Sequence, residues 1–302
     1  MKTYTLGYPE KENFAVALGN FDGVHIGHTK LINAMTSFGL PTLVYTFYDH
    51  PLNVIKGEGT VRVINTRAEK ESILIDLGVD ALVFEDFSSV RDMSPSDFVD
   101  KILINKLSAK EVVCGFNYRF GKKNAGDTVL LKQLLSARGV GLTVIDEVTL
   151  DGVGVSSSAV RSALLNSDME RAGEMLGRPY FLKSSVKHGK ALGRTLGFPT
   201  VNLDFEEGRV VPAYGVYVSR FSFENKSFPA IANVGVRPTV DTDVRPMLEA
   251  HVIDFEGDLY GKEVKVELLR KLRDEKKFSD VNELKVQVFK DIETAKKYFQ
   301  ER

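Results

Sequence analysis

The segment Phe14–His28 reads FAVALGNFDGVHIGH and joins a short apolar run to a glycine-rich loop and a helix start. Its first five residues, Phe14–Leu18, are all apolar, which is typical of a strand buried in a parallel sheet. The loop then runs into a helix predicted to begin near His28 or Thr29. Glycines let the backbone approach a ligand closely, and a helix N-terminus offers free amide donors with a positive dipole potential. The segment therefore predicts a phosphate site at the end of a strand.

The alternation of apolar runs with helical patterns continues from this segment to about Leu176. Further strands are expected at Thr42–Phe47, Ala81–Phe84, Glu111–Cys114 and Leu142–Ile145. Helices between them carry start and stop signals, namely Thr66 with Glu69 as a capping box, Ser94–Asp97 as a cap with a first-turn proline, and Gly78 as a stop. Repeated βα units predict a doubly wound parallel sheet, in which ligands bind outside the carboxyl ends of the strands.

The pattern changes after Gly177-Arg178-Pro179, where strand-like runs alternate with turn residues. These runs are Phe181–His188, Gly215–Phe223, Ser227–Ala232, Met247–Phe255 and Val264–Leu269. They predict an antiparallel β-barrel. A terminal helix follows, with an apolar stripe formed by Val281, Leu284, Val288, Ile292, Ala295 and Phe299. The expected domains are therefore residues 1–178 and 183–302.

Composition limits the class of protein. A chain of 302 residues exceeds the usual size of one hydrophobic core, and 43% apolar with 27% charged residues is typical of a globular protein. A net charge of −1 provides no drive toward nucleic acid or anionic lipid. The sequence contains neither a membrane-spanning run nor a secretory signal, and its single cysteine fits a reducing compartment. We expect a cytoplasmic protein with small-molecule substrates, no nucleic-acid or membrane partner, and an oligomeric state that the sequence does not reveal.

The two histidines of the glycine-rich loop, His25 and His28, are three residues apart at a helix start. They can point to one side and stabilise the charge that develops on a phosphate group during its transfer. Surface residues, ordinary caps or metal ligands are the alternatives, and metal is the weakest because Asp22 is the only close carboxylate. A second candidate phosphate segment, Val155–Arg161, brings consecutive serines and the cation of Arg161 to another helix start. Alone it indicates an N-cap, but the two segments together favour a nucleotide site.

In the second domain the segment His188–Asn202 contains a glycine every fourth residue, at Gly189, Gly193 and Gly197. A long glycine-rich connection between strands is one interpretation. The other is a nucleotide site, because Thr200 and Asn202 are two apart and face one side of an extended segment, where they could hold a phosphate oxygen and a hard cation.

A carboxylate completes this second candidate site. Glu249 lies opposite the apolar face that Leu248, Ala250 and Val252 form on one strand. A solvated acid is the common interpretation of such a position. Beside a glycine turn and a Thr-Asn pair, the carboxylate can instead act as general base to a substrate hydroxyl that attacks a γ-phosphate.

The segments Gly19–His28, Gly115–Gly121 and Val155–Arg161 resemble those of the nucleotidylyltransferases, and within them the bacterial bifunctional riboflavin kinase/FMN adenylyltransferase family, also called FAD synthetase. The segments Gly197–Asn202, Asn233–Thr239 and Glu249–Gly261 are similar to its riboflavin kinase domain. The resemblance implies an N-terminal adenylyltransferase domain and a C-terminal kinase domain. It also implies that riboflavin and ATP give FMN and ADP, and that FMN and ATP give FAD and pyrophosphate, with Mg²⁺ supporting both steps.

The resemblance also implies roles for individual residues. In the first domain His25 and His28 contact the ATP phosphates, and the rest of the nucleotide and flavin site consists of Gly19, Asn20, Phe21, Asp22, Gly23, Gly27, Asn117, Arg119, Ser156, Ser157 and Arg161. In the second, Glu249 is the base for the ribityl 5′-hydroxyl, Thr200 and Asn202 bind magnesium-ATP, and the remaining nucleotide and flavin contacts are Gly189, Gly193, Arg194, Gly197, Phe198, Pro199 and Arg273. Asn117 replaces a common aspartate and Ser158 a common threonine, and both replacements keep a polar group.

Two other functions compete with this one. His25–His28 is the four-residue signature of class I aminoacyl-tRNA synthetases, although the net charge gives tRNA binding little support. A flavin-binding or regulatory protein with inactive sites is the second rival, and the polar groups kept at both sites disfavour it.

Overall fold

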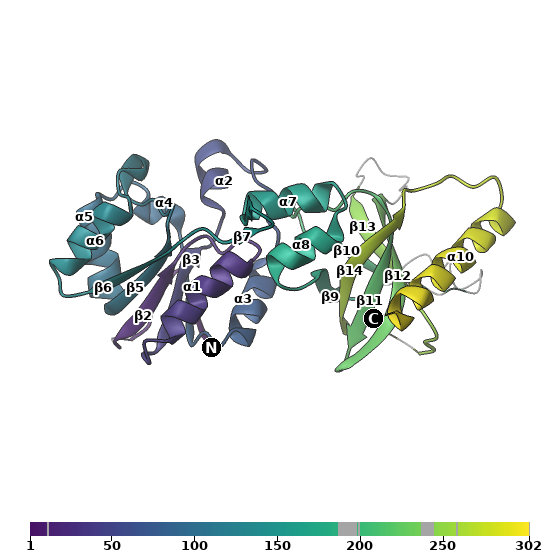
Figure 1. The fold of residues 1–302 in the computed structure, drawn as a ribbon, viewed down its shortest axis with the longest axis horizontal. Coiled ribbons are helices and arrows are strands. Elements are labelled where there is room, and N and C mark those ends of the chain that lie inside the picture. Colours follow the sequence, from purple (N-terminus) through teal and green to yellow (C-terminus); the bar gives the residue numbers. More distant parts are fainter. Residues whose placement is uncertain (11, 187–197, 199, 237–244, 258, 302) are drawn as a thin grey trace. The chain divides into compact units, whose positions relative to one another are not determined.

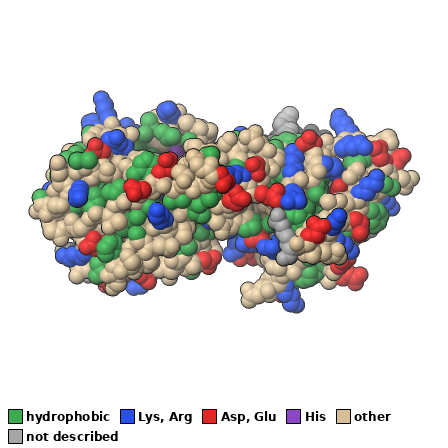
Figure 2. Space-filling model, viewed as in Figure 1, with side chains coloured by type: hydrophobic (Ala, Val, Ile, Leu, Met, Phe, Trp, Pro, Cys, Tyr) green, Lys and Arg blue, Asp and Glu red, His purple; other side chains and the backbone are tan. Residues whose placement is uncertain are grey.

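The computed structural model describes residues 1–10, 12–186, 198, 200–236, 245–257 and 259–301. The chain forms two compact units, Met1–Ser157 and Ser158–Arg302, hereafter the first and second unit (Figure 1). The segment from residue 158 to residue 178 thus belongs to the second unit rather than the first. The expected limits of 1–178 and 183–302 concern function, and they stay a prediction. Figure 2 shows acidic and basic side chains interspersed over the visible face of both units.

The first unit is built on a six-stranded sheet in the order β1-β4-β3-β2-β5-β6, with every pair parallel. The strands are β1 (Lys2–Thr5), β2 (Phe14–Leu18), β3 (Thr42–Phe47), β4 (Ala81–Glu85), β5 (Ala109–Gly115) and β6 (Gly141–Ile145). The five residues of β2 are buried, because this strand lies inside the sheet with covered faces. The predicted parallel sheet is confirmed, and β1 is an edge strand that the sequence pattern missed.

Helices and short turns connect these strands. They are α1 (Ile26–Thr36), α2 (Pro51–Lys56), α3 (Arg67–Asp76), α4 (Phe87–Val90), α5 (Pro95–Asp97), the π-helix η1 (Phe98–Lys106), the 3₁₀ turn η2 (Lys122–Asn124) and α6 (Thr128–Ser136). Strands β7 (Thr149–Leu150) and β8 (Val153–Gly154) form a small antiparallel ribbon. The predicted capping box of Thr66 and Glu69 and the cap at Ser94 are present, and Gly78 follows α3 with a φ of +78°.

One predicted helix start is wrong. Helix α1 begins at Ile26 rather than near His28 or Thr29, because His25 is its N-cap.

The second unit is a curled, six-stranded antiparallel half-barrel in the order β10-β13-β12-β11-β14-β9. Its elements are α7 (Ser157–Leu165, beginning at the last residue of the first unit), α8 (Met169–Leu176), β9 (Tyr180–Ser185), β10 (Thr200–Asp204), β11 (Gly215–Phe223), β12 (Lys226–Val236), β13 (Pro246–Val252), β14 (Glu263–Arg273) and α10 (Val281–Gln300). The predicted antiparallel architecture and terminal helix are confirmed.

Helix α10 packs against the sheet at β11 and β12. Ile292 and Ala295 of its predicted stripe are buried with Val216 and Ile231 of the sheet. Val281 is 52% exposed, so the first turn of the helix does not take part in this core.

Candidate active sites

In the sheet of the first unit, the order in which the chain adds strands reverses between β2 and β5. From β2 the chain proceeds to β3 and β4 on one side, whereas β5 and β6 lie on the other, and Leu18 pairs with Cys114 across the junction. Ligands of doubly wound sheets bind at such a switch point, outside the carboxyl ends of the strands. The two loops that leave these ends are Gly19–His28 and the segment after Gly115. The topology therefore brings together two of the three segments that the sequence singled out.

The two loop histidines cap helix α1 reciprocally. The His28 N–H donates to Nδ1 of His25 at 3.4 Å, and the His25 N–H donates to Nδ1 of His28 at 3.3 Å. The rings stack with centroids 3.7 Å apart, and His25 is 8% exposed. Because each Nδ1 accepts a hydrogen bond, we assign the proton of the neutral rings to Nε2. Capping uses Nδ1 of each ring, and the predicted phosphate contact would therefore involve Nε2.

The backbone of this loop is unusual. Phe21 and Val24 have φ values of +47° and +41°, in the left-handed region that non-glycine residues seldom adopt, and Gly23 between them has +82°. Phe21 is fully buried, and its ring lies 4.9 Å from that of His28. A β-branched residue in this conformation is strained, so surrounding contacts must hold the loop in place.

Buried contacts with distant segments hold the loop. The Asp22 carboxylate accepts from the Ile64 N–H at 2.8 Å, and the Ser157 hydroxyl donates to the Asp22 carbonyl at 2.9 Å. Asp22 is 3% exposed, so these hydrogen bonds are shielded from water. The structure therefore brings Ser157, a predicted site residue, to the histidine loop.

The other predicted residues of this site have varied surroundings. Asn117 and Ser156 are exposed, and Arg119 forms a 3.6 Å ion pair with Asp127 at the start of α6. Arg161 lies on α7, in the second unit, and is half-buried. His50, for which no role was predicted, caps α2 by accepting from the Leu52 N–H.

Glycines of the loop lie against its own aromatic side chains. A Cβ at Gly27 would lie 3.0 Å from the imidazole of His25, and one at Gly19 would lie 3.1 Å from the ring of Phe21. Both distances are shorter than most Cβ contacts, so the absence of a side chain allows each ring its position.

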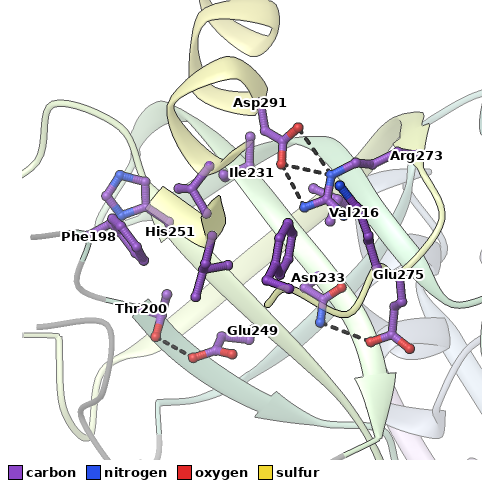
Figure 3. A pocket seen from close by; sticks show the side chains of 14 residues that line it. Phe198, Thr200, Val216, Ile231, Asn233, Glu249, His251, Arg273, Glu275 and Asp291 are labelled. Atoms are coloured by element: carbon purple, nitrogen blue, oxygen red, sulfur yellow. Dashed lines mark hydrogen bonds and ion pairs between the residues drawn. The ribbon is translucent and has the colours of Figure 1, made fainter. Parts of the chain in front are cut away.

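The second unit contains a cavity of about 270 Å³ between the sheet and the segment leading into α10 (Figure 3). Its lining combines six apolar or aromatic side chains with eight polar or charged ones, and small-molecule sites likewise combine apolar surface with convergent polar groups. The lining residues are Phe198, Thr200, Val216, Ile231, Asn233, Glu249, His251, Arg273, Glu275, Lys276, Phe278, Leu284, Val288 and Asp291.

A single row of paired residues crosses five strands of this sheet. The row consists of Asn202, Glu249, Asn233, Val216 and Arg273, from β10 to β14. Directly paired residues project from the same face of a sheet, so the antiparallel register gathers these side chains. Glu249 thereby lies between two amides, those of Asn202 and Asn233. The Thr200 hydroxyl, one diagonal step away, donates to Oε1 of Glu249 at 2.6 Å.

An ion pair with α10 lies at the other end of the cavity (Figure 3). Nε and Nη2 of Arg273 donate to Asp291 at 3.0 Å and 2.9 Å, and Gln287 donates to the same carboxylate at 2.9 Å. Asp291 is 4% exposed. The guanidinium also lies 5.7 Å from the ring centroid of Phe278. These contacts attach the helix to the last residue of β14.

The predicted kinase residues Thr200, Phe198, Glu249 and Arg273 line this one cavity, and Asn202 pairs with Glu249. Predictions at Gly189, Gly193, Arg194, Gly197 and Pro199 lie outside the described residues.

Five further polar lining residues were not predicted from the sequence as part of the site: Asn233, His251, Glu275, Lys276 and Asp291. Asp291 had a detectable signal, because it falls at helical spacing between the apolar residues Val288 and Ala295.

Metal-binding capacity is limited in the part of the chain that the structure describes. No group of three or more His, Cys, Asp or Glu side chains there could hold a metal ion. The oxygen donors of Thr200, Asn202 and Glu249 nevertheless suit Mg²⁺, which keeps several waters and takes only one or two protein ligands beside substrate phosphates. None of the described helices is both long and apolar enough to cross a membrane.

Comparison with known proteins assigns the two units. Residues 8–159 match the FAD synthetase family and residues 176–299 match riboflavin kinase. The bifunctional riboflavin kinase/FMN adenylyltransferase of Bacillus subtilis is 34% identical, over 99% of this chain and 98% of that protein. Its Escherichia coli counterpart is 34% identical, over 98% and 96%. A crystal structure described as a macrolide-efflux protein from Streptococcus pneumoniae has a TM-score of 0.89 and 30% identity, over 98% and 99%. The chain therefore belongs to the bifunctional riboflavin kinase/FMN adenylyltransferases, with the FAD synthetase domain first and the kinase domain second.

Proposed function

We propose that the cavity of the second unit is the riboflavin kinase site and that Glu249 is its general base. The ribityl 5′-hydroxyl of riboflavin gives its proton to Glu249 as its oxygen attacks the γ-phosphorus of ATP, and ADP leaves. The hydroxyl of Thr200 orients the carboxylate through the 2.6 Å hydrogen bond to Oε1. Asn233, on the neighbouring strand, pairs with Glu249 from the other side, and its amide donates to Oε1 of Glu275 at 3.3 Å.

The apolar part of the cavity suits the flavin ring system. Val216, Ile231, Leu284 and Val288 supply aliphatic surface, and Phe198 and Phe278 supply aromatic surface. Such surface favours a planar, largely apolar ring by the hydrophobic effect and by ring packing. The ribityl chain would then extend from this region toward Glu249.

Magnesium would be held by Thr200 and Asn202 together with the ATP phosphates, and when bound it neutralises phosphate charge. Both side chains lie on β10, two residues apart, and Asn202 pairs directly with Glu249. The protein's own contribution is to hold the carboxylate of Glu249 and the hydroxyl of Thr200 in a fixed arrangement on adjacent strands.

FMN adenylylation would take place at the switch point of the first unit. An oxygen of the FMN phosphate attacks the α-phosphorus of ATP, and pyrophosphate leaves. Nε2–H groups of His25 and His28 and the N-terminus of α1 stabilise the charge that develops on the phosphates. Ser157 and Asn117, both in the first unit, complete the nucleotide and flavin contacts. As catalytic domain limits we propose residues 1–178 and 183–302, which the family matches at 8–159 and 176–299 support.

The observation that carries the kinase assignment is the row that places Glu249 between two amides beside the Thr200 hydroxyl. The test is a time course of flavins separated by chromatography after the pure protein is mixed with riboflavin, ATP and Mg²⁺. FMN that appears first and then gives way to FAD supports both sites. FMN that persists would contradict the adenylyltransferase site, and unchanged riboflavin would contradict the kinase site, with added FMN as the control for the second step.

A further inference from the structure

Helix α3 contains a lysine whose surroundings are unusual for a cation. Lys70 is only 8% exposed, and its ammonium lies 5.8 Å from the ring centroid of Phe84 on β4. Lysine is almost never buried unless its charge has a partner. Nζ of Lys70 donates to the carbonyl of Asn20 at 2.9 Å, so the buried cation binds the main chain of the histidine loop.

The Asn20 carbonyl accepts a second hydrogen bond from inside the sheet. The Thr46 hydroxyl on β3 donates to it at 2.9 Å, so both acceptor positions of this oxygen are used. Asn20 directly precedes Phe21, the first of the loop residues with positive φ. The doubly held carbonyl therefore fixes the entry to the strained turn that leads to His25 and His28.

We propose that Lys70 is a positioning residue for adenylyl transfer. Its ammonium holds the Asn20 carbonyl, and through the strained turn it sets the placement of the two histidines. This inference rests on the proposed function of the loop, and it adds a residue on α3 that acts through the loop backbone.

The charge of Lys70 makes the inference testable by pH. Burial lowers its pKa to about 8; the Asp22 carboxylate opposes this shift, and Arg67 on the same helix adds to it. Phe84 and Thr46, on the neighbouring strands, contribute no charge. In the unfolded chain the ammonium keeps its proton up to about pH 10.4. Between the two values the unfolded state binds more protons, so this group makes the folded state more stable as pH rises.

The rate of FMN adenylylation should fall as pH rises, whereas the contribution of Lys70 to stability increases. Above pH 8 the amine loses the charge that strengthens its bond to Asn20, so the turn is held less firmly. A merely structural lysine would not separate these two trends, because activity would follow stability. For the unchanged protein we expect kcat for FMN adenylylation to fall through pH 8 while the thermal midpoint of the first unit does not fall.

The direct test is Lys70→Met in the full-length chain, assayed with FMN, ATP and Mg²⁺. A misplacement of catalytic groups lowers kcat, so we expect a loss of roughly tenfold or more with little change in KM for FMN. The fall through pH 8 should disappear, and riboflavin kinase activity of the same molecules, which reports intact folding of the second unit, should stay normal. The thermal midpoint of the first unit should be unchanged or higher, because burial penalises the charged form of Lys70.

Two further variants sharpen the test. Lys70→Arg keeps a cation that does not titrate near pH 8, and it should recover part of kcat without the fall. Thr46→Val removes the neutral donor to the same carbonyl, and it should cost less activity and keep the fall. Normal kcat in Lys70→Met together with impaired His28→Ala would overturn the inference alone. Normal kcat in both would overturn the adenylyltransferase site itself. If Lys70→Met does not fold, a flat pH profile of the unchanged protein from pH 7 to 9.5 still refutes the proposal.

Discussion

The two candidate sites of this chain differ in the chemical groups that they offer to a phosphate. In the first unit, a strained loop and a helix N-terminus offer main-chain amides and two capping histidines, and buried anchors such as Asp22 and Ser157 hold the backbone. In the second unit the proposed chemistry belongs to side chains such as Glu249, which the register of regular strands gathers on one face. Substitutions should therefore act through backbone placement at the first site and group by group at the second.

The largest expected effect comes from Glu249, the proposed general base of the second site. Glu249→Gln keeps the shape and can still accept from Thr200, but it cannot take the substrate proton. Loss of a general base typically costs about 10²–10⁴-fold, so we expect riboflavin phosphorylation to fall roughly 10³-fold. FMN adenylylation, measured by adding FMN, should be unchanged. Equal loss of both activities would show that the two sites are not separate.

The next effect tests how α10 is attached to the sheet. Asp291→Asn leaves Arg273 without its countercharge in a partly buried position, and breaking such a pair costs about 3 kcal/mol or more. Calorimetry that resolves the two units should show a lower transition for the second unit and an unchanged one for the first.

The matched control for this variant is Glu170→Gln. It removes an exposed pair with Arg270, and such pairs contribute little to stability. A comparable loss in both variants would mean that burial of Asp291 does not matter.

A somewhat smaller effect is expected at the histidine loop. His28→Ala removes one phosphate donor and one half of the reciprocal cap, so the pathway should stop at FMN with adenylylation reduced about 10²-fold. Ser94→Ala removes a cap from α5 and should leave adenylylation normal. FAD produced at the usual rate by the histidine variant would show that this loop is not the site.

The smallest effect is expected from a variant that shifts the His25 ring without removing any catalytic group. In Gly27→Ala the new methyl group would lie 3.0 Å from the His25 ring, so the imidazole must shift by a few tenths of an ångström. We expect adenylylation to fall about tenfold, because small misplacements of catalytic groups are costly.

Stability should not follow this loss of activity, because alanine favours a helix over glycine by about 1 kcal/mol. Gly173→Ala in α8, where the new methyl group has ordinary contacts at 3.7 Å, is the matched control, and it should leave adenylylation intact. Full activity in the Gly27 variant would mean that the ring position is not critical.

The parts of the fold that the sequence predicted are those that depend on local patterns. Apolar runs identified β2 and β3, and the caps at Thr66 and Ser94 were read from short-range spacing. Strand β1 was missed because its four residues are partly or fully exposed and show no apolar run. The start of α1 was misplaced because histidine is not among the usual capping residues.

The sequence predicted the site residues only where residues that act together are also close together in the chain or are connected by the family resemblance. Thr200 and Asn202 could be paired from their spacing, and the family resemblance connected them with Glu249. The proposed role of Asn233 depends on strand register, and that of Lys70 on a carbonyl fifty positions away in the chain; no local pattern encodes either. Such contacts required the three-dimensional structure.

Cys114, which pairs with Leu18 at the switch point, can report the opening of the sheet through the rate at which a thiol reagent labels it. Cys114 is the single cysteine of the chain, it is buried, and burial raises its thiol pKa to about 12. A thiol reagent should therefore react only when the parallel sheet opens, and the labelling rate measures that opening free energy without a signal from the second unit. ATP or FMN bound at the adjoining loops would stabilise the closed sheet and so lower the labelling rate of Cys114. One native atom can thus report occupancy of one active site in a protein that has two.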